Sequence, residues 1–81
     1  MGLAAITVNA EWDPEANVWV ASSDDVPGLI TEAESLEALQ KKLVVMIPEL
    51  LKANGVFADS DLREIPLNLV ARREQLISLR Q

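Results

Sequence analysis

The feature that most constrains the fold is a stripe of apolar residues at helical spacing between Ser35 and Gly55. Ser35 can cap the first turn with its hydroxyl, and Gly55 can adopt the left-handed conformation that ends many helices. The pattern therefore predicts one amphipathic helix over residues 36–53. The residues of the stripe recur every three or four positions and are Leu36, Leu39, Leu43, Met46, Ile47 and Leu50.

Pro48 lies inside this predicted helix, where a proline removes a hydrogen bond and costs about 3 kcal/mol. On a helical wheel it falls on the polar side, and a proline there bends the helix away from itself, over the core. We expect a kink near residues 44–48 and not a break.

Segments with the pattern of β-strands precede and follow the predicted helix in the sequence. Residues 4–12 alternate apolar and polar side chains, which is typical of a half-buried strand. Residues 17–22 are apolar on both sides, as in a central or doubly covered strand. Pro66 lacks an amide hydrogen, so the last strand is expected to begin there or to lie at an edge. The predicted strands span residues 4–12, 17–22, 29–33 and 64–73.

The turns between these strands have recognisable residues. Asp13, Pro14 and Asn17 are turn formers, so the first two strands are expected to form a hairpin. In the next connection Pro27 fixes one backbone angle and Gly28 permits the following one, which predicts a tight turn. The chain is thus expected to form one α+β domain over residues 1–81, with order βββαβ and the helix on one face of a four-stranded sheet.

Composition argues against an enzyme. The chain has 81 residues and contains neither cysteine nor histidine, which removes disulfides and the commonest general base and metal ligand. Two-metal hydrolysis needs several converging carboxylates, and no such set is evident. The serines have no histidine to activate them. We expect no catalytic residues, no metal and no cofactor.

Charge is distributed unevenly. Residues 1–40 contain eight acids and no base, whereas residues 41–81 contain five acids and seven bases. A net charge of −6 disfavours direct binding to nucleic acid and favours a basic partner. Ordinary solubility charge is the alternative interpretation.

Chain length and hydropathy indicate the expected oligomeric state and location. A chain of this length buries a limited core, so a homo-oligomer is expected, with a dimer as the simplest case. No apolar run is long enough to cross a bilayer, and no signal peptide is evident, so the expectation is a cytoplasmic protein that does not bind membranes.

The run DVPGLITEAESLEAL resembles the strand, Pro-Gly turn, strand and helix start of the HicB-like antitoxins, and the upstream NVWVASSDDVPG strengthens the similarity. The resemblance covers about residues 6–55. It implies a truncated RNase H-like fold in which the last strand lies beside the first and parallel to it. It also implies an antitoxin that masks a small, basic, RNA-cleaving toxin of the HicA type. Many HicB proteins carry a DNA-binding segment after this domain, whereas this sequence ends at Gln81, which weighs against a DNA-binding repressor.

One helix leaves one face of the sheet uncovered, where exposed apolar residues mark interaction sites. If the helix covers the face of Val18 and Val20, then Trp19 lies on the open face, and tryptophan is enriched among interface anchors. An ordinary place in the core is the alternative for Trp19. The candidate interface residues are Trp19, Ala21, Asp24, Asp25, Val70 and Arg72.

The end of the chain keeps Leu76, Ile77 and Leu79, which is too apolar for an idle tail. This tail either extends the last strand or packs against a second subunit. Residues 54–62 are expected to form a loop, with Val56 and Phe57 folding back on the helix. The sequence therefore favours a non-enzymatic interaction domain of the antitoxin type. The alternative is an orphan structural domain that only self-associates.

Overall fold

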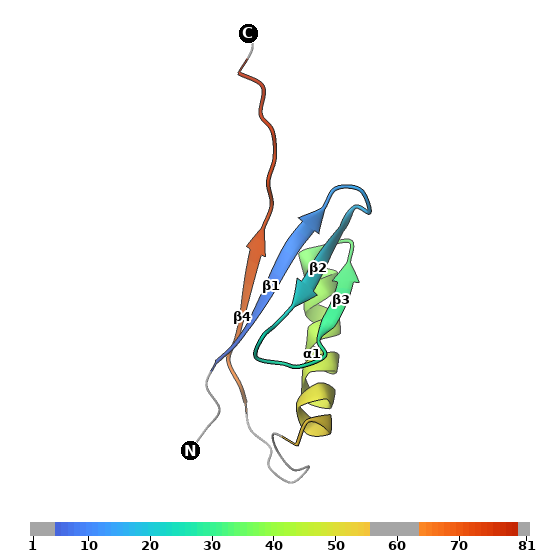
Figure 1. Cartoon of the computed structure of the whole chain (residues 1–81), viewed down its shortest axis with the longest axis vertical. Helices are drawn as coiled ribbons and strands as arrows, with labels where there is room; N and C mark the ends of the chain where they lie inside the picture. The colour runs from blue at the N-terminus through green and yellow to red at the C-terminus, as the bar shows by residue number, and fades with distance from the viewer. Residues whose placement is uncertain (1–4, 56–63, 80–81) are drawn as a thin grey trace.

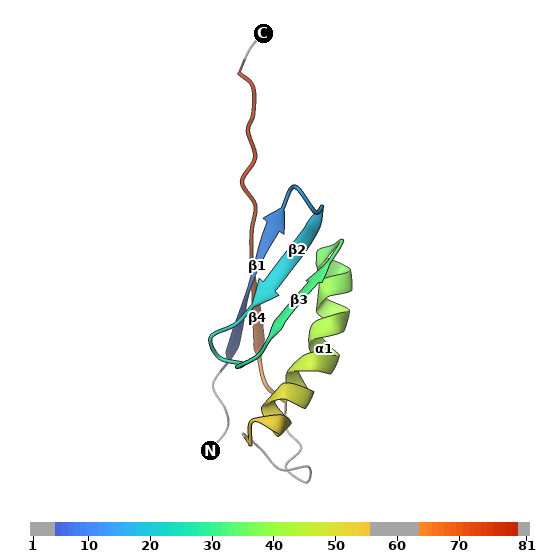
Figure 2. The same ribbon diagram turned by 45° about the vertical axis from the view of Figure 1, so that its right-hand side comes forward.

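The computed structural model describes residues 5–55 and 64–79 of the chain. One helix lies against one face of a four-stranded sheet (Figures 1 and 2). This arrangement confirms the predicted α+β class and the βββαβ order, while the expected contacts of Val56 and Phe57 lie outside the described residues. The elements in chain order are β1 (Ile6–Asp13), β2 (Val18–Ser22), β3 (Ile30–Ala33), α1 (Leu36–Ala53) and β4 (Leu67–Arg72).

The order of strands in the sheet is β3-β2-β1-β4. β1 runs antiparallel to β2 and parallel to β4, and β2 runs antiparallel to β3. The last strand therefore lies beside the first and parallel to it, as expected. Ile6 donates its N–H to the carbonyl of Pro66 over 2.9 Å, so the proline, which has no N–H, stands directly before an edge strand.

A four-residue loop sets the register of the β1–β2 hairpin. The Asp13 carboxylate accepts hydrogen bonds from the backbone N–H groups of Glu15 and Ala16, at 3.0 and 3.3 Å. Asn17 closes the loop in a left-handed conformation, with φ of 58°. Strand pairing then places Trp12 opposite Trp19. Because residues directly opposite each other share a face, both tryptophans lie on the same side of the sheet.

That side is the one that α1 covers, which corrects the predicted placement of Trp19 and Ala21. Ala21 is 0% exposed, and Trp19 packs against the core. The open face instead carries Val18 and Val20, because strand residues alternate between faces. The buried core consists of Ile6, Val8, Ala10, Ala21, Val26, Leu29, Ala33, Leu39, Leu43, Ile47 and Leu51.

The ends of α1 follow from local chemistry. The Ser35 hydroxyl accepts a hydrogen bond from the N–H of Ala38 over 3.0 Å, and Gly55 has a φ of 73°. The helix is continuous through the exposed Pro48, so the predicted absence of a break is confirmed and the kink stays a prediction.

The Pro-Gly turn is attached to the C-terminal end of α1. Leu29 donates its N–H to the carbonyl of Val26 over 3.1 Å, and Gly28 has a φ of 87°, as a type II turn requires. The side-chain amide of Asn54 donates to the carbonyl of Pro27 over 3.2 Å. The turn that starts β3 is thus held to the end of the helix, with Val26 buried beneath it.

Candidate interaction surfaces

The candidate sites among the described residues are two surfaces. In residues 5–55 and 64–79, no polar or charged side chain is buried. The same residues contain no group of three histidine, cysteine or acidic side chains that could hold a metal ion. No helix in this part of the chain is both long enough and apolar enough to span a bilayer.

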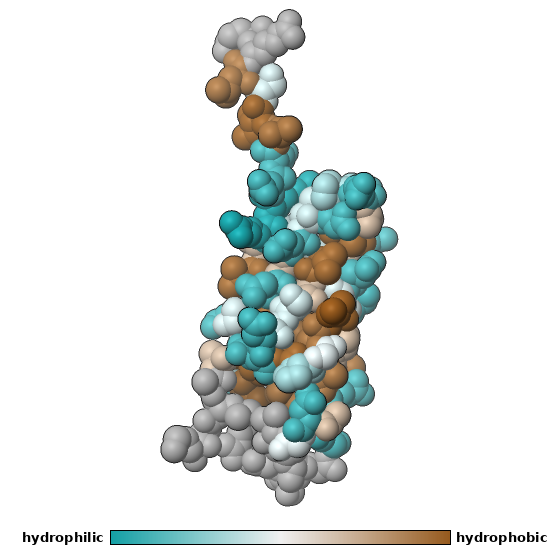
Figure 3. Space-filling model, viewed as in Figure 1, coloured by the Kyte–Doolittle hydropathy of each residue, from teal (hydrophilic) through white to brown (hydrophobic). Residues whose placement is uncertain are grey.

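The first surface is the open face of the sheet, opposite α1. Val18 and Val20 of β2 are half-buried there, whereas Ile30 of β3 is 75% exposed and Val70 of β4 is 50% exposed. Figure 3 looks onto this face and shows apolar patches set among polar residues. The four residues come from three of the four strands, so the apolar character spans the sheet.

Charged side chains lie between these apolar residues. Glu11 of β1 stands between Val20 on one side and Arg72 on the other. Glu32 of β3 stands opposite Val20 and is exposed. Because adjacent residues of a ladder have side chains about 5 Å apart, carboxylates and apolar groups form one mixed surface.

The structure divides the six candidate interface residues between different places. Val70 and Arg72 are exposed on the open face of β4, and Asp24 and Asp25 are exposed in the loop between β2 and β3. Trp19 and Ala21 lie on the covered face, so the six do not form one patch.

Asp25 has a structural role in that loop. Its carboxylate accepts a hydrogen bond from the N–H of Thr7 over 2.9 Å, while the Ser23 hydroxyl donates to the carbonyl of Thr7 over 2.6 Å. These two side chains form hydrogen bonds with the backbone N–H and C=O of Thr7, at a point on β1 that β2 does not reach because it ends at Ser22. The acidic loop is thereby tied to the sheet.

The two tryptophans and an arginine form a cluster at the hairpin end of the covered face. The rings of Trp12 and Trp19 meet edge to face, with centroids 5.4 Å apart and an interplanar angle of 64°. The guanidinium carbon of Arg73 lies 4.4 Å from the centroid of the Trp12 ring. This contact fixes the direction of the residue that follows β4.

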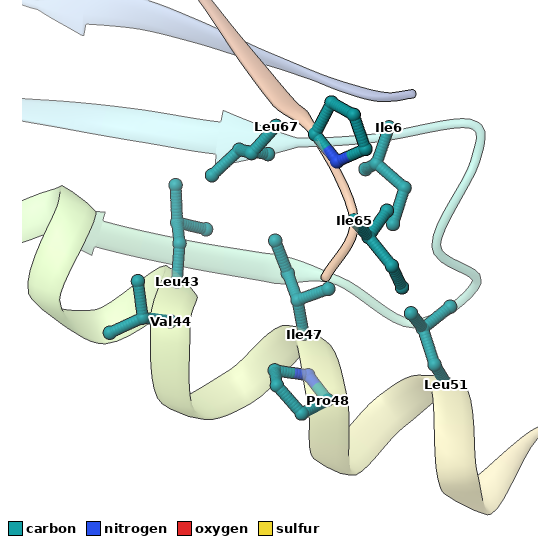
Figure 4. A pocket seen from close by; sticks show the side chains of 9 residues that line it. Ile6, Leu43, Val44, Ile47, Pro48, Leu51, Ile65 and Leu67 are labelled. Atoms are coloured by element: carbon teal, nitrogen blue, oxygen red, sulfur yellow. The ribbon is translucent and has the colours of Figure 1, made fainter. Parts of the chain in front are cut away.

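The second surface is a groove between α1 and β4, about 220 Å³ in volume. α1 lies over β2 and β3, so Leu67 and Leu69 of β4 are only half-buried. Figure 4 shows side chains of α1 pointing across the groove toward the start of β4. The residues that line it are Ile6, Leu43, Val44, Ile47, Pro48, Leu51, Ile65, Pro66 and Leu67.

Sequence reasoning missed Ile30, Val18 and Val20 as open-face residues, and it missed the groove. A signal for the open-face residues was present: Trp12 alternates in step with Ile6, Val8 and Ala10, and pairing of the first two strands sets Trp12 opposite Trp19. The groove had no such signal, because it depends on the lateral position of the helix over the sheet.

Together, the fold and surfaces define a small α+β domain with one uncovered sheet face and an open edge strand. The chain belongs to the family described as a domain of unknown function (DUF1902), which matches residues 5–78. It is similar to the hypothetical protein TTHA1013 from the extremely thermophilic bacterium Thermus thermophilus, known from a crystal structure. The two are 49% identical, with 93% of this chain and 99% of that chain covered and a TM-score of 0.67. No curated protein matches the chain.

Proposed function

We propose that this chain is a non-enzymatic protein-binding domain and acts as a HicB-like antitoxin that masks a small, basic, RNA-cleaving toxin of the HicA type. The observation that carries the proposal is the open sheet face, on which Ile30 is 75% exposed and Val70 is 50% exposed. Exposed apolar side chains gathered on one face of a small domain mark a site where another protein docks.

The charge on this face favours a basic partner. Glu11 and Glu32 stand beside the apolar residues, and the first forty residues, which supply β1, β2 and β3, contain no lysine or arginine. Carboxylates interspersed with apolar side chains steer a basic protein toward the face, and in the described sheet Arg72 is the one cation on it, beside Glu11. A protein is therefore the better partner for this surface than a nucleic acid.

The order of elements supports the antitoxin class in particular. The HicB-like resemblance rests on the residues from Asn17 to Leu39 and implies a last strand that is parallel to the first and beside it. The observed sheet has that pairing, between β1 and β4. The quoted motif does not include β4, so the position of β4 beside β1 adds to the support that the motif gives.

The test is co-expression with the product of the adjacent reading frame, where a short basic protein is expected. Size-exclusion chromatography with light scattering should give a defined hetero-complex that weakens as salt is raised. Replacing Ile30→Asp should weaken the complex on the order of 100-fold, because an acid would be buried without a partner. The matched control is Val45→Asp, since Val45 is 59% exposed on α1, away from the sheet face. Unchanged binding by Ile30→Asp would remove the open face from the proposal.

The alternative, a structural domain that only self-associates, is favoured by one observation. Leu76, Ile77 and Leu79 are 101%, 79% and 88% exposed beyond the end of β4. Under this alternative no hetero-complex forms with the neighbouring product, and Ile30→Asp leaves every measured assembly unchanged.

A further inference from the structure

The segment of residues 73–79 continues from β4 and projects past the β1–β2 hairpin, away from the rest of the molecule (Figures 1 and 2). The radius of gyration is 15.4 Å, whereas about 12 Å is expected for a compact chain of this length. Three apolar side chains of this arm are almost fully exposed. An apolar arm outside the core indicates that something else covers it.

The side chains of the arm have defined directions. Arg73 lies over Trp12, so residue 73 faces the side of the sheet that α1 covers. In an extended segment the directions alternate, which places Ile77 and Leu79 on the α1 side and Leu76 on the open side. Figure 3 shows apolar side chains along this arm.

The outer edge of β4 is available for pairing. In the described sheet β4 pairs with β1 alone, and the carbonyl of Pro66 accepts from Ile6 on that inner side. In a parallel ladder, every second residue of a strand directs its backbone groups toward the neighbouring strand. The even-numbered residues of β4 face β1 in this way, so the odd-numbered residues direct their N–H and C=O groups outward. A row of free backbone groups of this kind is a template for another strand.

We propose that two copies of the chain pair through β4 and the arm, antiparallel about a two-fold axis at Arg73, so that the arm of each copy lies along β4 of the other. In this register Leu67 stands opposite the partner's Leu79, and Leu69 stands opposite the partner's Ile77. Both pairs face α1, so the arm of one copy covers the groove between α1 and β4 of the other. The two sheets join into one sheet of eight strands.

The residues on the open side select this register. Val70 stands opposite the partner's Leu76, and Arg72 stands opposite the partner's Glu74, twice by symmetry. Directly opposite side chains in an antiparallel pair are about 5 Å apart, close enough for an ion pair.

Other registers lose these matches. A shift of one residue moves Ile77 and Leu79 to the wrong face and misaligns the outward backbone groups. A shift of two residues in either direction places Arg72 opposite itself or Glu74 opposite itself. In the proposed register the one like-charged pair is Arg73 with the partner's Arg73, and that guanidinium lies against the ring of Trp12 in its own chain.

This inference does not rest on the antitoxin proposal, because it uses only contacts between two copies of the chain. The first measurement is sedimentation equilibrium of the full chain over a micromolar concentration range. A dimer is expected, and a monomer at all concentrations overturns the proposal.

The charge pair tests the register without disturbing the core. Arg72→Glu and Glu74→Arg should each raise the dimer Kd about tenfold, because two attractive pairs become two repulsive ones. The double variant should restore the dimer to within about threefold of the original Kd, since the pairs are then rebuilt with reversed signs. Failure of the double variant to recover would overturn the register. Ile30→Asp on β3 is the control and should leave the Kd unchanged.

Cross-linking gives a second readout, since the chain has no cysteine of its own. Arg73→Cys should form an inter-subunit disulfide on mild oxidation, because paired residues on the axis have Cα atoms about 5.5 Å apart. The control on the same strand is Ala71→Cys, whose two copies would be about 13 Å apart, roughly four residues along a strand. Cross-linking of Ala71→Cys at the rate of Arg73→Cys, or of neither variant, would contradict the two-fold axis at Arg73.

Discussion

The two edges of the sheet, β3 and β4, differ in how well they are covered. On the β3 side, α1 covers the strands, and the ammonium group of Lys42 donates to the backbone carbonyl of Glu32 over 2.5 Å. On the β4 side the helix leaves a groove, and the edge continues into an exposed apolar arm. A short, charged and covered edge resists pairing with other chains, whereas a long apolar edge invites it. The domain therefore covers its apolar residues at the β3 edge and leaves them exposed at the β4 edge.

Truncating core leucines on the two sides should give the largest contrast. Leu39→Ala on the β3 side removes a fully buried side chain and should cost about 3 kcal/mol at every protein concentration. Leu69→Ala on the half-buried β4 side should cost about 1–2 kcal/mol, with the cost increasing as concentration rises, because a second copy supplies its cover. Urea denaturation at several protein concentrations measures both. Equal, concentration-independent costs would mean that the two sides are alike.

Enlarging two matched alanines should give a smaller contrast. Ala21 and Ala71 both pair with Ala10 on the covered face, one from β2 and one from β4. Ala21→Leu should destabilise by about 1–3 kcal/mol, because the residue is 0% exposed and a larger side chain would overpack the core. Ala71→Leu should stay within about 0.5 kcal/mol of the original, because Ala71 is exposed. Thermal unfolding followed by circular dichroism compares them, and a costly Ala71→Leu would show that β4 is covered in the single chain.

The smallest expected effect concerns the root of the arm. Arg73→Gln removes the cation over the Trp12 ring and should cost about 0.5–1 kcal/mol, as exposed contacts of this type do. Trp12 and Trp19 are the only tryptophans, so the fluorescence of the protein reports on this cluster directly. An unchanged emission spectrum would indicate that the guanidinium does not rest on the ring in solution.

The sequence predicted those parts of the fold that depend on local signals. The predicted bounds of the helix agree with α1 because Ser35 and Gly55 determine its ends locally. The strands were placed to within three residues, although residues 64–66 and 73, assigned to the last strand, lie outside β4. Parallel pairing of β1 with β4 came from family resemblance, since periodicity contains no information on strand order.

The placement of the candidate interface residues was predicted only in part, and their role in binding stays a prediction. Val70 and Arg72 lie exposed on the open face as expected, and the prediction for Trp19 and Ala21 was wrong because β2 is apolar on both sides. The composition of such a strand does not indicate which of its two faces is covered. The register with β1 determines the covered face. The apolar tail was recognised as too apolar to be idle, whereas its direction required the contact of Arg73 with Trp12.

Pairing of β1 with β4 also affects how the chain is made. Ile6 pairs with Leu67, which follows it by 61 positions. At a synthesis rate of about 5–20 residues per second, the first strand waits roughly 3–12 s on the ribosome before its parallel neighbour exists. During that time the hairpin, the third strand and the helix can form from local contacts, while the far edge of β1 has no partner. Translation speed over the residues between β1 and β4 therefore sets how long the nascent chain is open to mispairing with its neighbours.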